Sequence, residues 1–177
     1  MLISFFTFWI LIFDHTQLSD NANQIFFFCF LFSNLIPLIT VILLKKMGKI
    51  DDMDASKKEQ RFLPLLLGIF YAGVGFMVLS NLDAQGLVRG LMFCFMTNTV
   101  IIIIITKYWK ISIHAMGIAG PLTALWIHGF HSYIIIISIA IMLGWSRVNL
   151  RAHNITQVLA GYFLGTLLTW AQLVALF

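Results

Sequence analysis

The sequence predicts an all-α integral membrane protein, a single domain over residues 1–177 that forms a polytopic bundle of about six transmembrane helices. Its composition is 60% hydrophobic and 10% charged, which leaves too little polar surface for a water-soluble domain of this size. Its apolar runs, such as 25–44 and 62–80, approach or reach the roughly 20 residues that a helix needs to cross a bilayer. Long continuous runs favour helices over the short alternating strands of a membrane barrel.

Polar breaks separate the apolar runs, and each long run is a candidate transmembrane helix. We expect spans near 25–44, 62–80, 88–106, 113–130, 132–146 and 155–177. The stretch 2–13 is apolar too, but it is about a turn and a half short of a typical span. It fits a short or tilted helix, and equally the remainder of a longer span. No cleavable signal peptide is expected, because this stretch has no positive n-region and no small-residue cleavage site before Asp14.

Several residues inside the predicted spans are explained by packing. Cys29 and Cys94 lie in apolar runs without a second Cys or a His at metal-ligand spacing, so we interpret them as core residues. The others are Asn34 and Asn98, expected to hydrogen-bond between helices, Pro37, expected to kink its helix, and Gly161 and Gly165, expected to let two helices pack closely.

The loops alternate across the membrane if every predicted span crosses it. One side, here called face A, then carries loops 45–61, 107–112 and 146–154. The other side, face B, carries loops 14–24, 81–87 and 129–132.

Positive charge is concentrated on face A. Ten of the eleven Lys and Arg residues lie there, and only Arg89 lies toward face B. By the positive-inside rule face A is cytoplasmic, at a plasma (inner) membrane. A phosphate site would itself require basic residues, but setting aside Arg61, Arg147 and one lysine still leaves seven cations on face A. Because these cations flank hydrophobic spans, the net charge of +4 favours lipid headgroups, not nucleic acid, as the partner.

The polar turn within 144–165, the third segment, holds residues suited to binding or attacking an anion. Arg147 beside Ser146 offers a planar fork of donors for phosphate oxygens, and His153 can act as nucleophile or proton carrier. The alternative is that Arg147 and Arg151 are ordinary flanking charges and His153 is an interfacial polar residue.

Two earlier segments lie on the same face. In the second, 110–114, Ser112 and His114 open a span whose first N–H groups would point toward face A and attract phosphate. In the first, 56–64, Lys57 and Arg61 would share one side of a helix if 57–61 is helical, with Lys58 beside them. The alternatives are a snorkelling histidine and a solvated run of charge.

In this order, the three segments resemble the type 2 phosphatidic acid phosphatase (PAP2) and haloperoxidase superfamily, over roughly residues 45–170. Its third motif, Ser-Arg, five residues, His, three residues, Asp, is matched in spacing by Ser146, Arg147 and His153, with Gln157 where the family has the acid. Its second motif, Pro-Ser-Gly-His, keeps the serine and the histidine in residues 111–114. Its first motif keeps the arginine at Arg61, although Asp54 stands at the family's lysine position.

The resemblance implies a PAP2-like fold and a membrane phosphatase that hydrolyses a lipid phosphate or isoprenyl diphosphate through a phosphohistidine, without metal or other cofactor. The implied roles are His153 as nucleophile, His114 as proton donor to the leaving oxygen, Arg61, Arg147, Ser112 and Ser146 as phosphate ligands, and Lys57 or Lys58 in place of the family lysine. Gln157 would orient His153 through its amide oxygen but brings no charge, and with Asn154 it also matches a helix capping box.

Other functions stay open at the level of sequence. One is a non-catalytic member of the same fold that binds anionic lipid or a partner. Another is a transporter or other bundle whose basic face only sets its orientation. His128 and His131 are interpreted as part of an aromatic belt with Trp126 and Tyr133, since no third metal ligand is in sight.

Overall fold

A computed structural model describes residues 2–13, 20–53 and 57–177 of the chain, and every regular element in these ranges is helical. In chain order they are α1 (Leu2–Phe13), α2 (Ala22–Phe30), a π-helical turn (Leu31–Leu35), α3 (Ile36–Lys46), a 3-10 turn (Lys58–Gln60), α4 (Phe62–Asn81), α5 (Gly86–Tyr108), α6 (Ile113–His128), α7 (Tyr133–Asn149) and α8 (Ile155–Leu176). The prediction of an all-α chain is confirmed.

Four of the described helices are long and apolar enough to cross a membrane. They are Ala22–Lys46, which joins α2, the π turn and α3, together with α4, α5 and α8. Their 20 to 25 residues correspond to about 30–38 Å at 1.5 Å per residue. By contrast, α6 has 16 residues and α7 has 17, or about 24–26 Å, so the count of six spans stays a prediction. Residues 2–13 form a helix of 12 residues.

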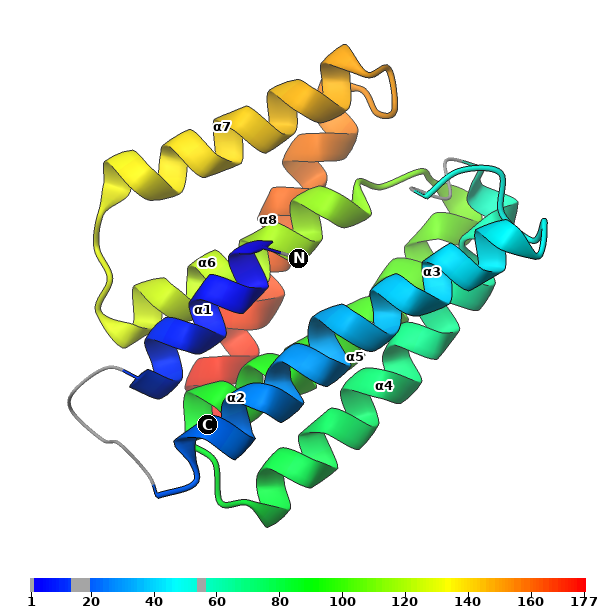
Figure 1. Cartoon of the computed structure of the whole chain (residues 1–177). Helices are drawn as coiled ribbons and strands as arrows, with labels where there is room; N and C mark the ends of the chain where they lie inside the picture. Colours follow the sequence, from blue (N-terminus) through cyan, green and yellow to red (C-terminus); the bar gives the residue numbers. More distant parts are fainter. Residues whose placement is uncertain (1, 14–19, 54–56) are drawn as a thin grey trace.

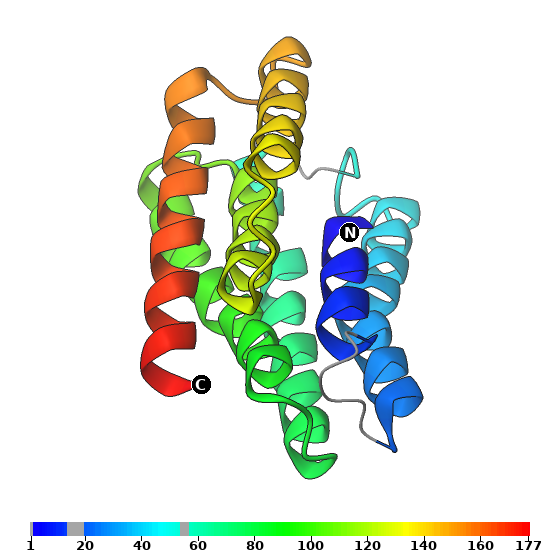
Figure 2. The same cartoon turned by 90° about the vertical axis from the view of Figure 1, so that its left-hand side faces the viewer.

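The helices form one bundle in which successive elements run back and forth (Figure 1). The connections α3–α4, α5–α6 and α7–α8 lie at the same end of the bundle, whereas the α4–α5 turn lies at the opposite end (Figures 1 and 2). The loops assigned to face A therefore share one end of the molecule, and each of the three segments overlaps one of these loops.

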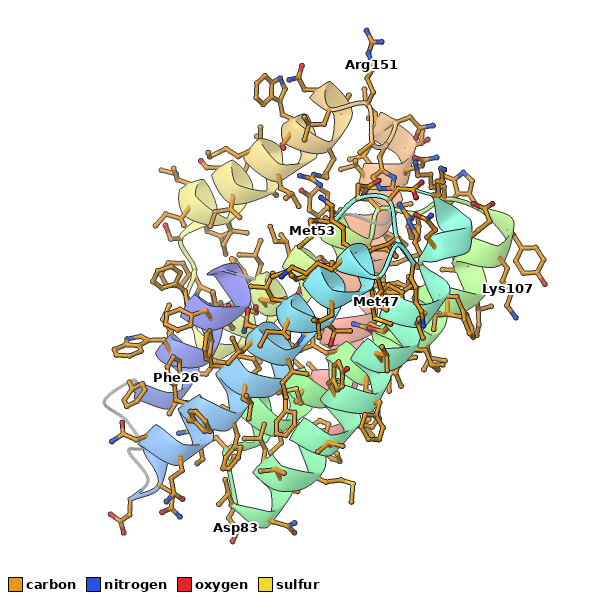
Figure 3. All side chains as sticks on the ribbon, turned by 45° about the vertical axis from the view of Figure 1, so that its right-hand side comes forward. Phe26, Met47, Met53, Asp83, Lys107 and Arg151 are labelled. Atoms are coloured by element: carbon orange, nitrogen blue, oxygen red, sulfur yellow. The ribbon has the colours of Figure 1, made fainter. Side chains whose placement is uncertain are left out.

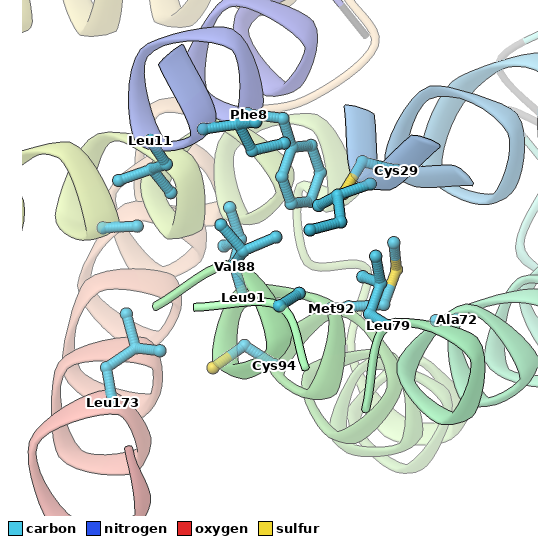
Figure 4. Close-up of a cluster of buried hydrophobic side chains, with 14 of the residues drawn as sticks. Phe8, Leu11, Cys29, Ala72, Leu79, Val88, Leu91, Met92, Cys94 and Leu173 are labelled. Carbon is cyan, nitrogen blue, oxygen red and sulfur yellow. The ribbon is translucent and has the colours of Figure 1, made fainter. Parts of the chain in front are cut away.

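The main hydrophobic core lies where α1, α2, α4, α5 and α8 meet (Figure 4). Its fully buried members include Phe8, Leu79, Leu91 and Met92. The thiols of Cys29 and Cys94 are free and buried in the same cluster, in agreement with the packing role predicted for them.

The π turn is explained by Pro37, and it contains the buried Asn34. Because Pro37 has no N–H, the carbonyl of Ser33 lacks the donor that an α-helix would supply, and the helix widens by one residue ahead of it. The N–H of Ile36 accordingly donates to the carbonyl of Leu31, five residues back. Asn34 lies buried in this wide turn and accepts a hydrogen bond from Ser4 Oγ of α1, at 3.0 Å. The predicted interhelical bond of Asn34 is confirmed.

A polar cluster also joins α5 to α8. Asn98 Nδ2 donates to Thr169 Oγ1 at 3.0 Å, and Gln172 Nε2 donates to Asn98 Oδ1 at 2.9 Å. Thr97 Oγ1 bonds to the amide oxygen of Gln172. These bonds satisfy polar groups that lie between the two helices, and they confirm the interhelical role predicted for Asn98.

Helices α6 and α8 pack closely against each other. A Cβ on Gly161 would lie 2.6 Å from the carbonyl oxygen of Ser112, and one on Gly165 would lie 2.8 Å from that of Met116. Both distances are too short for any side chain, so glycine at these positions lets the two backbones touch. The predicted close helix packing is confirmed, and it brings the start of α6 against the start of α8.

Candidate functional site

The start of α6 is fixed directly to α8. Ser112 is the N-cap of α6, and its Oγ accepts a hydrogen bond from the Ala115 N–H at 3.3 Å. Its own N–H donates to the Gln157 carbonyl at 3.2 Å, and the residue is fully buried. The second and third segments are therefore in contact, and the Ser112 hydroxyl already serves as a helix cap.

The start of α8 holds His153 through a capping box. The Gln157 N–H donates to Asn154 Oδ1 at 2.9 Å, and the Asn154 N–H donates to Gln157 Oε1 at 3.2 Å. His153 Nδ1 lies 3.0 Å from the same Oε1. Since the Asn154 N–H can only donate, the amide atom facing it is the oxygen, and Nδ1 must then carry the proton. The other ring nitrogen, Nε2, is left with its lone pair.

The surroundings of His153 favour its neutral form. Burial lowers its pKa below the ordinary histidine value, and the positive charges of Arg61, Lys110 and His114 lower this pKa further. The hydrogen bond to Gln157 acts in the opposite direction but does not outweigh them. The interactions also show that residues from all three segments lie near one imidazole, which is 8% exposed.

Arg61 links the first segment to the second. It is 3% exposed, and its Nη1 donates to the carbonyl of Ile111 at 3.2 Å. Its side chain lines a cavity of about 150 Å³ together with Pro64, Ile113 and His114. His114 is exposed on the first turn of α6, so it can reach a ligand bound beside Arg61.

The lysines of the first segment are placed differently from Arg61. Residues 58–60 form a single 3-10 turn, so the α-helical face considered for Lys57 and Arg61 is not formed. Lys57 Nζ instead pairs with Asp51 Oδ2 at 2.6 Å on the surface, which raises the pKa of Lys57 and lowers that of Asp51. The Lys58 side chain and Asp54 lie outside the described residues.

Ser146 and Arg147 end α7 beside the histidine loop. The carbonyl of Arg147 accepts hydrogen bonds from the N–H groups of Ala152, at 3.1 Å, and His153, at 3.2 Å. Arg151 takes a positive φ of 53°, which turns the chain between these two helices. The carbonyl of Arg147 thus fixes the position of the His153 backbone. The side chains of Ser146 and Arg147 are half-buried.

Large apolar cavities lie beside α7. One of about 430 Å³ is lined by α7 and α8, and another of about 500 Å³ is lined by α6, α7 and α8. Both are lined by Ala140 and Tyr162, whose hydroxyl donates to the Ala140 carbonyl at 2.6 Å. No residue of α7 is buried, in keeping with its position apart from the rest of the bundle (Figure 1).

Sequence reasoning missed several residues of this region. Lys110 acts on His153 through its charge, and Ile111 contributes its carbonyl to Arg61, yet neither is among the predicted site residues. At the opposite end, the ring centroids of His131 and Tyr133 lie 4.5 and 4.9 Å from that of Trp126. Within the described residues, no three His, Cys, Asp or Glu side chains gather as metal ligands would.

Comparison with known proteins adds no assignment. No family model, curated protein or solved structure matches the chain.

Proposed function

We propose that the chain is a membrane phosphatase that hydrolyses a lipid phosphate or an isoprenyl diphosphate through a phosphohistidine, in the manner of the PAP2 superfamily. The supporting observation is a continuous set of contacts through the three segments. Arg61 bonds to Ile111, the next residue Ser112 bonds to Gln157, and Gln157 holds His153. Segments about 50 and 90 residues apart meet around one neutral imidazole.

In the proposed reaction, the lone pair of His153 Nε2 attacks phosphorus. A P–N bond forms and the P–O bond to the leaving group breaks, while His114 gives a proton to the leaving oxygen. Water then cleaves the P–N bond and releases phosphate. Arg61 and Arg147 hold the non-bridging oxygens, and catalysis depends mainly on this positioning and charge stabilisation.

The apolar cavities beside α7 support a lipid as the substrate. Their lining of residues such as Ile141, Leu159 and Trp170 suits a hydrocarbon chain. In the proposed arrangement, the chain enters sideways next to α7 while the headgroup meets the cations at face A, on the cytoplasmic side of the plasma membrane.

The test is an assay of purified protein in detergent on phosphatidic acid, phosphatidylglycerol phosphate and isoprenyl diphosphates, without added metal. We expect phosphate release that His153→Ala abolishes and His131→Ala leaves unchanged, because His131 lies at the other end of the bundle. Acid-labile, base-stable labelling by ³²P-substrate should appear in the native chain and disappear in His153→Ala. Absence of turnover, or turnover independent of His153, would contradict the proposal.

A second candidate is a non-catalytic protein of the same kind that binds anionic lipid. Two observations favour it: Gln157 brings no charge to stabilise an imidazolium, and the Ser112 hydroxyl is used as a helix cap. Binding of phosphatidic acid vesicles without hydrolysis of any substrate in the panel would support this function, and a trapped phosphohistidine would exclude it.

A further inference from the structure

A second cavity lies on the other side of Arg61, between the start of α4 and the end of α5. Its volume is about 200 Å³, and it is lined by Glu59, Arg61, Phe62, Leu65, Ile103, Thr106 and Lys107. We call it the α4–α5 cavity. It shares Arg61 and Leu65 with the cavity at His114, and apart from Arg61 none of its lining residues is a predicted site residue.

Thr106 is the residue that indicates a ligand. It is 6% exposed, and within the described residues its hydroxyl has no hydrogen-bond partner. Other threonines of α5 avoid this situation, because Thr97 and Thr99 donate to the carbonyls of Phe93 and Phe95 in their own helix. A buried hydroxyl left without a partner is costly, and an acceptor oxygen of a ligand in the cavity would remove that cost.

The charges and the surroundings of the cavity define the ligand. Arg61 and Lys107 bring two positive charges against one negative charge from Glu59, so an anion is favoured. Lys107 projects from the end of α5 at the edge of the molecule (Figure 3). The following Tyr108 and Trp109 are exposed and have the amphipathic rings typical of the headgroup level of a membrane.

An apolar surface continues from the cavity along both helices. Phe62 and Leu66 of α4 stand four residues apart and are 55% and 46% exposed, and Val100 and Ile104 of α5 have the same spacing and are 42% and 53% exposed. A molecule with a phosphate in the cavity would therefore have hydrocarbon-compatible surface directly beside it.

We propose that the α4–α5 cavity binds the phosphate headgroup of an anionic bilayer phospholipid, which is a second lipid and not the substrate. Thr106 donates to a phosphate oxygen, Lys107 neutralises its charge, and the acyl chains lie over the exposed residues of α4 and α5. The proposal goes beyond the proposed function and does not depend on it, because it requires no chemistry at His153.

The test is a lipid titration of the purified chain, read by native mass spectrometry and by thermal unfolding. Phosphatidylglycerol should bind and stabilise the native protein, whereas phosphatidylcholine should do so much less. Lys107→Gln should weaken phosphatidylglycerol binding by about fivefold, the effect of one cation near an anionic lipid surface. Thr106→Val should also weaken it, and Glu59→Gln should tighten it because the opposing charge is gone.

Matched controls separate this site from general effects. Lys46→Gln removes an exposed lysine at the same end of the bundle, and Thr99→Val removes an α5 hydroxyl that is bonded within its own helix, so both should bind phosphatidylglycerol as the native chain does. His153→Ala should bind normally too, which keeps the result independent of catalysis.

Three results would overturn the proposal. The first is unchanged binding in both Lys107→Gln and Glu59→Gln, which are surface substitutions that do not threaten folding. The second is equal stabilisation by phosphatidylcholine. The third is equal stabilisation by inorganic phosphate alone, which would show that the cavity takes a free anion and not a lipid.

Discussion

At the scale of single residues, the side chain of Gln157 has two structural roles at once. Its Oε1 accepts from both the Asn154 N–H and His153 Nδ1, so one amide oxygen caps α8 and sets the tautomer of the proposed nucleophile. An aspartate or glutamate would do the same with a negative charge. Glutamine keeps the geometry and leaves out the charge that would stabilise an imidazolium.

Gln157→Glu should therefore raise the pKa of His153, because a carboxylate favours the charged ring and also suits a helix N-terminus. In the native chain, burial and neighbouring cations lower this pKa, so the acid limb of the pH–rate profile should lie below the ordinary histidine range. In Gln157→Glu the limb should move to higher pH. The maximal rate should rise, and the 10⁴-fold order of the reverse exchange in a serine protease sets an upper scale.

The measurement is a pH–rate profile of phosphate release, supported by the NMR titration of the His153 ring. Gln24→Glu makes the same change at the exposed start of α2, at the other end of the bundle, and should leave the profile unchanged. An acid limb that stays in place in Gln157→Glu would show that His153 is not the titrating group.

The same pKa has a consequence for stability. Because the pKa of His153 is lower in the folded protein than in the unfolded chain, the folded protein binds fewer protons as the pH falls through the histidine range. Folding stability should therefore decline over that range, and the decline should be smaller in Gln157→Glu.

At the scale of elements, the α6–α8 contact decides whether the site exists. The backbone of Gly161 lies against the carbonyl of Ser112, and the bond from Ser112 N to the Gln157 carbonyl depends on that approach. Small residues let α6 and α8 approach each other closely, as is common between helices inside membranes.

Gly161→Ala should destabilise the protein by about 1–3 kcal/mol, because the added methyl meets backbone that cannot yield without separating the helices. Thermal unfolding in detergent measures this loss, and phosphate release should fall with it. Gly117→Ala is the matched control on α6. No heavy atom lies within 4 Å of its added Cβ, so we expect no loss and a gain of up to about 1 kcal/mol from helix propensity. Equal losses in both variants would contradict a tight α6–α8 contact.

At the scale of the whole molecule, the positively charged loops and the motif segments share one end of the bundle (Figure 2). The four long helices fix which ends their loops occupy, whereas α6 and α7 are short for a typical bilayer. A short helix can be accommodated by local thinning of the bilayer. Whether α6 and α7 cross the membrane is therefore tested by cysteine labelling.

Single cysteines at the two ends should be labelled from opposite sides of the membrane. In a chain with Cys29 and Cys94 replaced by Ala, a membrane-impermeant maleimide should reach Asn81→Cys in intact cells and Lys46→Cys only after permeabilisation. His131→Cys and Arg151→Cys test α7 in the same way. Labelling of Lys46→Cys from outside would show that the proposed orientation is wrong. Labelling of both His131→Cys and Arg151→Cys from one side would show that α7 does not cross, and the Lys46 and Asn81 pair tests α4 in the same way.

The sequence by itself determined the fold class, because long continuous apolar runs favour helices, which satisfy their backbone groups internally, over the short alternating strands of a barrel. It also determined which loops carry charge. Polar and small residues within apolar runs typically mediate contacts between helices, so the sequence placed Asn34, Asn98 and the Gly161–Gly165 pair at such contacts. The spacing of Ser146, Arg147 and His153 likewise indicated where to look for a site.

Only the tertiary structure decided which of these residues meet. Lys57 and Arg61 are equivalent as cations in sequence, yet one pairs with Asp51 at the surface and the other is buried against Ile111. The tautomer of His153 depends on an amide oxygen shared with a helix cap, and the unpartnered hydroxyl of Thr106 depends on a cavity between two helices. Such properties arise from contacts between segments far apart in the chain, and local residue patterns carry no record of those contacts.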